Sequence, residues 1–197
     1  MPHDIGSRVK GIYEKAASNE ARITSEMESI SKSSGVELTG LDHRLKDPDS
    51  YIRKIQTGAN DLGISEEEVA ENLYDINRYT GIANSDTIAH KAVKALDDLE
   101  KRGYNIVGVR NAWLETGVAY KGINVKVISP EGQKFELQFH TPQSLKLKDL
   151  IHPYYEKQRV LPRNDPRWQT YEKEMLQIAS QIVPPKDISL VKRRHRK

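Results

Sequence analysis

Four side chains around residue 50 have the types and the spacing of a binding site for phosphate groups. Arg44 and Lys46 lie two residues apart, so on a strand both would point to the same side. Ser50 and Lys54 lie four residues apart and would share one face of a helix. A strand, a turn and a helix would then direct all four side chains at one phosphate chain, beside a helix N-terminus that favours anions. The ordinary alternative for an Arg-x-Lys sequence is a charged segment in solvent.

A second set of polar side chains alternates with apolar ones between residues 134 and 141. Glu136, Gln138 and His140 are its polar members, and the residues between them are Phe or Leu. This alternation predicts a strand that turns its Phe and Leu side chains to the core and lines its opposite face with the three polar groups. Plain exposure to solvent is the competing interpretation of that face.

Taken together, the two sets contain the residue types that transfer of a phosphoryl-type group needs. Such a transfer needs cations around the phosphates, carboxylates for a metal and a group that activates a hydroxyl.

The helices that would position these residues are predicted from apolar spacing and from capping residues. We expect an N-terminal helical region over 1–35 and a helix that starts at Asp49 or Ser50. Ser65 with Glu68 has the pattern of a capping box, and Ser85-Asp86 is expected to cap a helix that Gly103 ends. Two more helices are expected over 143–158, with a kink or break at Pro153, and over 166–183.

Strands are predicted for the segments 104–109, 122–128 and 134–139, and extended chain for 36–38 and 76–82. The turn sequence Ser129-Pro130-Glu131-Gly132 should join the last two strands as a hairpin. Helices interspersed with such strands favour an α+β class, with a central mixed β-sheet flanked by helices, and no internal repeat or domain boundary interrupts residues 1–197.

Composition limits the classes of protein that this chain can belong to. It has 197 residues, of which 37% are hydrophobic and 30% charged, and no apolar run has the length that a membrane span needs. The absence of cysteine excludes disulfides and thiolate metal sites. The formal net charge is +3, and much of the excess lies in a basic tail, 186–197. That tail is either a contact for nucleic acid or a solvated terminus, and the near-neutral remainder does not favour bulk nucleic-acid binding.

The order and spacing of these motifs resemble the RelA/SpoT family of nucleotide pyrophosphokinases over roughly residues 38–160. In that family an Arg-x-Lys, a Ser and a Lys hold the donor ATP, and Arg44, Lys46, Ser50 and Lys54 match them. The family then has an aspartate at the start of a strand that binds Mg²⁺. Asp75 stands at that place, where a turn aspartate is the alternative interpretation.

The acceptor side of the resemblance contains two departures. Tyr120 matches a tyrosine whose ring stacks on the acceptor base, and Glu136 matches a glutamate expected to bind Mg²⁺ or to act as a base toward the acceptor ribose. The family's Tyr-x-x-Ile-His and Glu-x-Gln-x-Arg-Thr sequences differ here, since Asn124 replaces the His and His140 replaces the Arg, while Gln138 is retained. The resemblance therefore assigns the donor residues more firmly than the acceptor residues.

The resemblance implies a RelA/SpoT synthetase-like fold and Mg²⁺-dependent transfer of pyrophosphate from ATP to the 3′-hydroxyl of a purine nucleotide. The sequence is closest to a divergent branch of secreted pyrophosphokinases and bacterial effector toxins. That branch implies a growth-inhibiting toxin, action in the cytoplasm of a cell that it reaches by secretion, and an immunity protein as partner. Two alternatives stay open: transfer to an RNA or tRNA 3′ end, and a catalytically inactive nucleotide-binding module.

Overall fold

The structure is a computed structural model that describes residues 6–192 and 194–195. The first five residues of the predicted helical region, and residues 193, 196 and 197 of the predicted basic tail, lie outside the described residues. The helices are α1 (Ser7–Ser34), α2 (Pro48–Leu62), α3 (Glu66–Glu71), α4 (Ile88–Lys101), α5 (Pro142–Gln158) and α6 (Pro166–Ala179), with short 3₁₀ helices η1 (Leu41–His43), η2 (Ala112–Leu114) and η3 (Ile188–Leu190). The strands are β1 (Glu37–Thr39), β2 (Arg78–Ile82), β3 (Asn105–Asn111), β4 (Ile123–Ile128), β5 (Lys134–His140) and β6 (Arg194–His195).

A mixed sheet runs through the middle of the molecule in the order β1-β2-β5-β4-β3-β6. Strands β2 and β5 are parallel, and the other neighbouring pairs are antiparallel. The predicted hairpin joins β4 to β5 through a turn in which the Gly132 N–H donates to the Ser129 carbonyl at 2.8 Å. The α+β class with a central mixed sheet is therefore confirmed.

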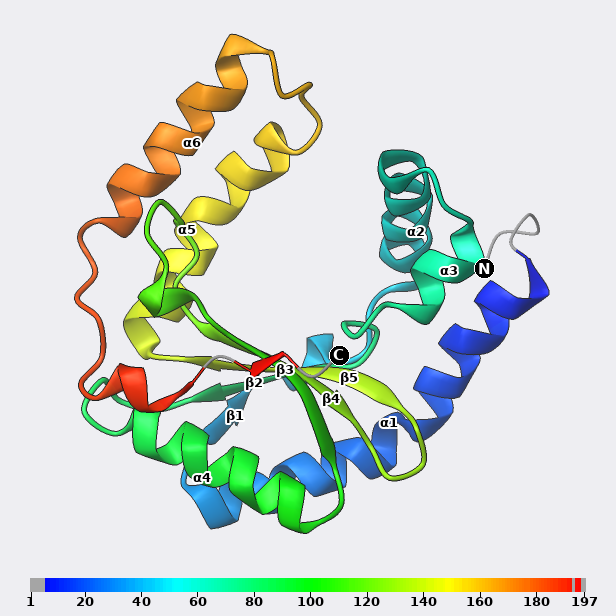
Figure 1. The fold of residues 1–197 in the computed structure, drawn as a ribbon, viewed down its shortest axis with the longest axis vertical. Helices are drawn as coiled ribbons and strands as arrows, with labels where there is room; N and C mark the ends of the chain where they lie inside the picture. The colour runs from blue at the N-terminus through cyan, green and yellow to red at the C-terminus, as the bar shows by residue number, and fades with distance from the viewer. Residues whose placement is uncertain (1–5, 193, 196–197) are drawn as a thin grey trace.

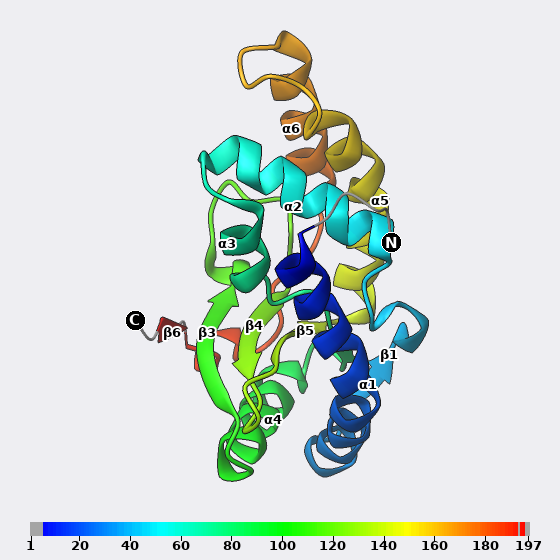
Figure 2. The ribbon, with the colours of Figure 1, turned by 90° about the vertical axis from the view of Figure 1, so that its right-hand side faces the viewer.

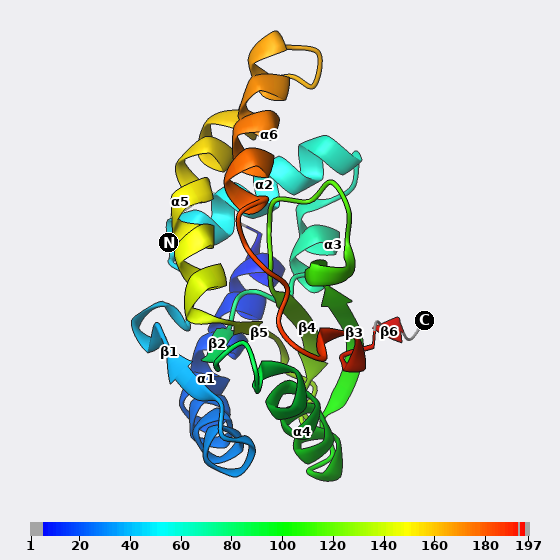
Figure 3. The same ribbon diagram turned by 90° about the vertical axis from the view of Figure 1, so that its left-hand side faces the viewer.

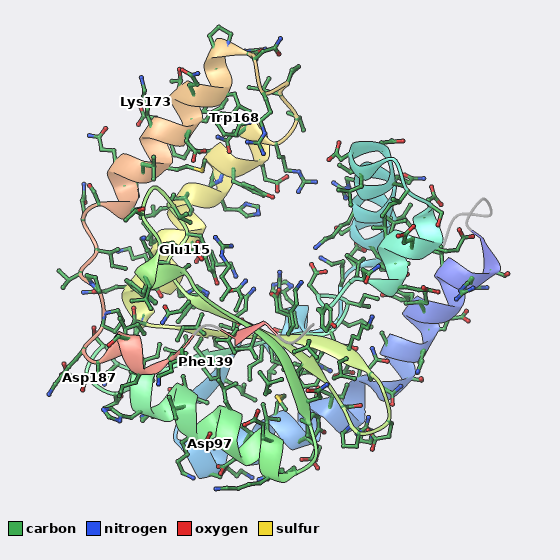
Figure 4. The ribbon with its side chains drawn as sticks, viewed as in Figure 1. Asp97, Glu115, Phe139, Trp168, Lys173 and Asp187 are labelled. Carbon is green, nitrogen blue, oxygen red and sulfur yellow. The ribbon has the colours of Figure 1, made fainter. Side chains whose placement is uncertain are left out.

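One face of the sheet carries the main hydrophobic core. Helices α1 and α4 pack against this face and against each other (Figures 1 and 2). Phe135, Leu137 and Phe139 of β5 all enter this core, as the alternation in the sequence predicts, and Figure 4 shows Phe139 on the α4 side of the sheet. The neighbouring residues of β5 must then face the other way.

The opposite face of the sheet lies between two helical pairs. Helices α2 and α3 rise at one end of this face and α5 and α6 at the other, so that the ribbon has the outline of a horseshoe in Figure 1. Figure 3 shows both pairs on the side of the sheet opposite α4. Each pair has a small core of its own: α2 and α3 pack on the N-terminal half of α1, and α5 packs on α6. The sheet face between the pairs is therefore free to carry polar groups.

Local signals located the helix starts around α2 and α3 well. Asp47 caps α2 by accepting from the Ser50 N–H at 3.0 Å, and Pro48 occupies the first turn. Ser65 caps α3 by accepting from the Glu68 N–H at 3.1 Å. None of the helices in the described part of the chain combines the length and the hydrophobicity that crossing a bilayer requires.

Two boundary predictions are wrong, and the break that was one alternative at Pro153 does not occur. Helix α4 starts after Thr87, because a turn forms first in which the Thr87 and Ile88 N–H groups both donate to the Asn84 carbonyl, so Ser85 and Asp86 do not cap it. Helix α5 continues through Pro153, which is exposed to solvent. Proline has no N–H to donate to the carbonyl of Asp149, four residues earlier, and water can solvate that carbonyl instead. Helix α6 ends at Ala179 rather than near residue 183.

Candidate active site

The segment before α2 crosses the start of β2 and directs its two cations to different places. The Lys46 N–H donates to the Ile76 carbonyl and the Arg78 N–H donates to the Arg44 carbonyl, each at 2.8 Å. Between these bonds Leu45 forms a single β-bridge with Asn77. Arg44 itself has helical angles, φ −68° and ψ −27°, as it closes η1. The predicted strand that points both cations to one side is therefore wrong.

Arg44 lies against α1 instead of facing the lysines. Its guanidinium forms an ion pair with Glu20 and donates to the Leu41 carbonyl at 2.7 Å. Glu20 also accepts from the Thr24 hydroxyl at 2.6 Å, and Thr24 is hydrogen-bonded to the Tyr79 hydroxyl at 2.9 Å. A small polar network thus ties the cation expected to bind ATP to the N-terminal helix.

Lys46 and Lys54 converge on Asp75, as a shared anion site requires. Their ammonium groups lie 3.1 Å and 2.6 Å from the same Asp75 oxygen. The Asp75 side chain is only 13% exposed, and burial alone would raise its pKa. The charges and hydrogen bonds of Lys54 and Lys46 outweigh that effect, so the pKa of Asp75 falls below its ordinary value of 3.8. The carboxylate is therefore ionised at neutral pH.

A pocket of about 270 Å³ opens beside this cluster at the start of α2. Lys46, Ser50, Asp75 and Arg78 line it together with neighbouring residues of the 42–47 segment. The pocket meets the N-terminal turn of a helix of 15 residues, where unpaired N–H groups favour negative charge. Three of the predicted donor-side residues and one unpredicted arginine thus share one cavity.

The parallel pairing of β2 with β5 places Glu136 beside Arg78, a residue that lines this pocket. Glu136 is the register partner of Arg78, and its N–H donates to the Asn77 carbonyl at 3.0 Å. Asp75 lies in the turn just before these residues. The turn that carries Asp75 and the strand that carries Glu136 are therefore connected through Asn77 and Arg78, although 61 positions separate the two carboxylates in the sequence.

Gln138 is held between Glu136 and a lysine of α5. Its amide N–H donates to a Glu136 oxygen, and its amide oxygen accepts from the Lys148 ammonium at 3.0 Å. Gln138 is 5% exposed, so plain exposure to solvent is the wrong interpretation of this face. Burial and the charge of nearby Arg78 lower the pKa of Lys148, while Glu136 opposes the shift. Because the Gln138 amide is held by Lys148 and donates to Glu136, it fixes the direction in which the Glu136 carboxylate points.

The two positions that depart from the family pattern contact each other through Tyr120. The Tyr120 hydroxyl donates to the Asn124 side-chain oxygen and lies 3.0 Å from Nε2 of His140. The Tyr120 and His140 rings meet edge to face with centroids 5.5 Å apart, and the Arg110 guanidinium lies 6.0 Å from the centre of the Tyr120 ring. Three of the four predicted acceptor residues thus form one connected group, while Gln138 bonds to Glu136 and Lys148.

His140 is a neutral imidazole in this group. It is fully buried, and burial with the charge of Lys148 lowers its pKa to about 3. Its Nδ1 lies 3.0 Å from the Ser144 hydroxyl. Because the single Tyr120 proton goes to Asn124, the Tyr120 oxygen is left as an acceptor toward Nε2 of His140. The histidine therefore holds the tyrosine in place and adds no charge.

Several solved structures are similar to this fold. A chain from the complex between the type VI effector Tas1 and its immunity protein superposes with a TM-score of 0.60 and 17% identity, over 91% of this chain and 100% of that chain. A GTP pyrophosphokinase family protein from Streptococcus pneumoniae gives 0.59 and 17%, over 90% and 92%. The small alarmone synthetase 1 from Bacillus subtilis bound to its product pppGpp gives 0.55 and 14%, over 85% and 90%. The chain has the alarmone synthetase fold.

The synthetase fold confirms the resemblance that the motifs predicted. Sequence comparison alone does not find it, because no protein-family model matches the chain and no curated protein matches its sequence. With identities of 14–17%, the superpositions establish the shared fold, and the roles of individual residues rest on the geometry of this chain.

The donor set of the synthetase-like site suits Mg²⁺. Within residues 6–192 no cluster of three or more His, Asp and Glu side chains occurs that could enclose a metal ion. Mg²⁺ in nucleotide enzymes usually takes one or two carboxylates and completes its shell with phosphate oxygens and water. Asp75 is ionised and Glu136 lies at the adjoining strand, so this pair fits a metal that arrives with a nucleotide.

The sequence patterns gave no role to Arg78 or Arg110. Arg78 starts β2 and Arg110 lies near the end of β3, and both face the same side of the sheet as Glu136 and Asn124. The period-two alternation that identified the polar face of β5 would have selected both arginines if the order of the strands had been known.

Proposed function

We propose that the protein transfers the β,γ-pyrophosphate of ATP to the 3′-hydroxyl of a purine nucleotide and releases AMP. The observation that carries this proposal is the meeting of two different half-sites. A cavity with Lys46, Ser50 and Asp75 adjoins, through the β2–β5 register, the strand that presents Glu136 and Gln138. Cations on one side and an oriented carboxylate on the other are what an in-line transfer between two nucleotides needs.

On the donor side, Lys46 and Lys54 would exchange their contact with Asp75 for the phosphates of ATP, and Ser50 would add a hydrogen bond. Both ammonium groups already lie within 3.1 Å of one anionic oxygen, so their positions suit a phosphate oxygen as well. Arg44 would join them after releasing Glu20. Mg²⁺ held by Asp75 and Glu136 would supply further positive charge to the phosphate oxygens.

On the acceptor side, Glu136 would accept the proton of the 3′-hydroxyl. The hydroxyl oxygen then forms a bond to the β-phosphorus, the bond from that phosphorus to the oxygen bridging to the α-phosphate breaks, and AMP leaves with the electron pair. Tyr120 would stack on the acceptor base, with Asn124 and His140 holding its hydroxyl group and Gln138 holding Glu136. The neutral His140 imidazole adds no charge to the place where the acceptor nucleobase would stack.

Product analysis tests the reaction directly. The purified protein is incubated with ATP, Mg²⁺ and, in turn, AMP, ADP, GDP, GTP and tRNA, and the products are separated by anion exchange and weighed by mass spectrometry. We expect AMP together with a nucleotide heavier by one pyrophosphate, and Glu136→Gln should reduce its formation by at least about 100-fold. Modification of tRNA alone would favour the RNA-end alternative, and nucleotide binding without any turnover would favour the inactive module.

The effector among the similar structures supports a toxic role in the cytoplasm of a target cell, where ATP and purine nucleotides are available. A producing cell would then need an inhibitor, so we propose an immunity protein as partner, as in that complex. Induced expression of the wild-type chain in bacteria should stop growth while Glu136→Gln does not. Equal growth of both strains at equal protein levels would contradict the toxic role.

A further inference from the structure

Arg78 stands where the two half-sites meet. As the first residue of β2 it lines the donor cavity with Lys46, Ser50 and Asp75. The same residue is the register partner of Glu136 on the neighbouring strand. Among the residues described, only this cationic side chain lines the donor cavity and is also paired in register with Glu136.

The guanidinium of Arg78 has no anionic partner within the described chain. Two nearby arginines are paired with carboxylates, Arg44 with Glu20 and Arg110 with Glu115 at 2.8 Å. Arg78 forms no ion pair and no side-chain hydrogen bond in residues 6–192, although it is half-buried. A guanidinium that is partly withdrawn from water and unpaired is unfavourable unless an anion binds to it.

The charge of Arg78 also reaches the acceptor side. It helps to lower the pKa of Lys148, whose ammonium binds Gln138, and it opposes the rise that burial and Glu136 produce in the pKa of Tyr120. Because the charge of Arg78 acts on both Lys148 and Tyr120, its guanidinium lies near the boundary between the donor cavity and the acceptor residues.

We propose that Arg78 is a catalytic residue that contacts the pyrophosphate group while it passes from ATP to the acceptor. This inference rests on the proposed function. As the oxygen–phosphorus bond to the acceptor forms and the bond to AMP breaks, negative charge stays on the non-bridging oxygens of the β-phosphate. A planar guanidinium can bind two such oxygens at once, and it gains most when their charge is greatest, in the transition state.

The competing explanation is structural: Arg78 could serve only to offset the charge of Glu136. Lys126 provides a matched comparison, because it is the register partner of Glu136 on the other side, in β4. Lys126 stacks on the Tyr74 ring with its ammonium 5.2 Å from the ring centre, and it is absent from the donor cavity. If Arg78 only offsets the charge of Glu136, removing the charge of Arg78 or of Lys126 should lower turnover alike. If Arg78 contacts the transferred group, only the Arg78 variant should lose turnover.

The test measures turnover and ATP binding for Arg78→Gln, Arg78→Lys and Lys126→Gln in the full chain. We expect Arg78→Gln to lower kcat by about 10³-fold, in the range found for arginines that stabilise phosphoryl transfer. Its Kd for ATP, from calorimetry with a non-hydrolysable analogue, should rise less than about fivefold. Arg78→Lys should recover only part of the rate, because one ammonium cannot bind two phosphate oxygens in the planar geometry of a guanidinium. Lys126→Gln should stay within about twofold of wild type.

Each contrary result has a distinct meaning. Arg78→Gln with a kcat within about threefold of an active wild type overturns the inference, and so does an equal loss of kcat in Lys126→Gln. A loss of ATP affinity as large as the loss of kcat would make Arg78 a ground-state binder and also overturn it. Arg78→Lys decides the question if the Gln variant does not fold, as judged by circular dichroism. A wild-type protein without turnover on any acceptor instead refutes the proposed function.

Discussion

Gly122→Ala should disrupt the acceptor group through a single added methyl. A Cβ at this position would lie 2.6 Å from Cε1 of His140 and 2.6 Å from the Tyr120 hydroxyl oxygen, whereas ordinary contacts are 3.4–4 Å. Neither neighbour is a flexible chain end: His140 is fully buried between Ser144 and Tyr120, and the tyrosine is a rigid ring. Both contacts must therefore lengthen by about 0.8 Å, from 2.6 to 3.4 Å, to reach the ordinary range.

The size of the effect follows from that crowding. Overpacking of this kind typically destabilises a protein by about 1–3 kcal/mol, which for a chain of 197 residues lowers the Tm by about 2–12 °C. If Tyr120 is the platform for the acceptor base, its displacement should raise the acceptor KM by about tenfold or more. ATP binding should change by less than about twofold, because Gly122 does not line the donor cavity.

The assay combines thermal unfolding, acceptor-dependent kinetics and ATP calorimetry. Gly11→Ala is the matched control, because it makes the same chemical change in the second turn of α1, where an added Cβ has no neighbour within 4 Å. Replacing a helical glycine by alanine should leave activity unchanged and stabilise the fold by about 0.5–1 kcal/mol. A Gly122→Ala protein with wild-type Tm refutes the packing argument. A lowered Tm with an unchanged acceptor KM refutes the acceptor role of Tyr120.

Three further predictions concern the charged groups of the site. Because the pKa of folded Asp75 is depressed, its stabilising effect should be present above the unfolded pKa near 4 and disappear as the pH falls toward the folded value; the difference in unfolding free energy between wild type and Asp75→Asn, measured with urea from pH 3 to 7, should shrink accordingly. The pKa of His140 is lowered to about 3, so unfolded chains bind the extra proton between about pH 3 and 6.5, and the wild type should lose stability on acidification through that range more steeply than His140→Gln in the same urea series. Glu20→Gln should release Arg44 and tighten ATP binding by at most about fivefold in calorimetry, because such a partly exposed pair contributes about 1 kcal/mol or less, and weaker binding would contradict a donor role for Arg44.

Local sequence patterns predicted the elements better than the contacts between them. The hairpin of β4 and β5 and the Ser65 cap of α3 were predictable because alternation, turn residues and capping groups act within a few residues. The direction of Arg44 was not, since it depends on Glu20, 24 positions earlier in another helix. Lys46 and Lys54, which were matched to the family pattern, do converge on Asp75. The spacing of the family motif thus indicated a tertiary contact that helix or strand periodicity does not indicate.

The least predictable part of the site was its centre. Arg78 and Glu136 become neighbours only because β5 pairs in parallel with β2, and no turn sequence specifies a parallel pairing between distant strands. The close approach at Gly122 was equally hidden, since it depends on a loop residue, Tyr120, folding back over the strand that follows it. Both features belong to tertiary packing and leave no local signal.

The pairing of β2 with β5 also sets when activity can first arise during folding. These strands are joined through a helix and two other strands, so their contacts close a long loop and form slowly compared with a hairpin or a helix. A nascent chain that ends after α4 has already made Lys46, Lys54 and Asp75, yet it lacks the strand that brings Glu136 to them. Catalytic competence is therefore expected to appear in one late step, when β5 joins the sheet, and partly folded chains should not spend ATP.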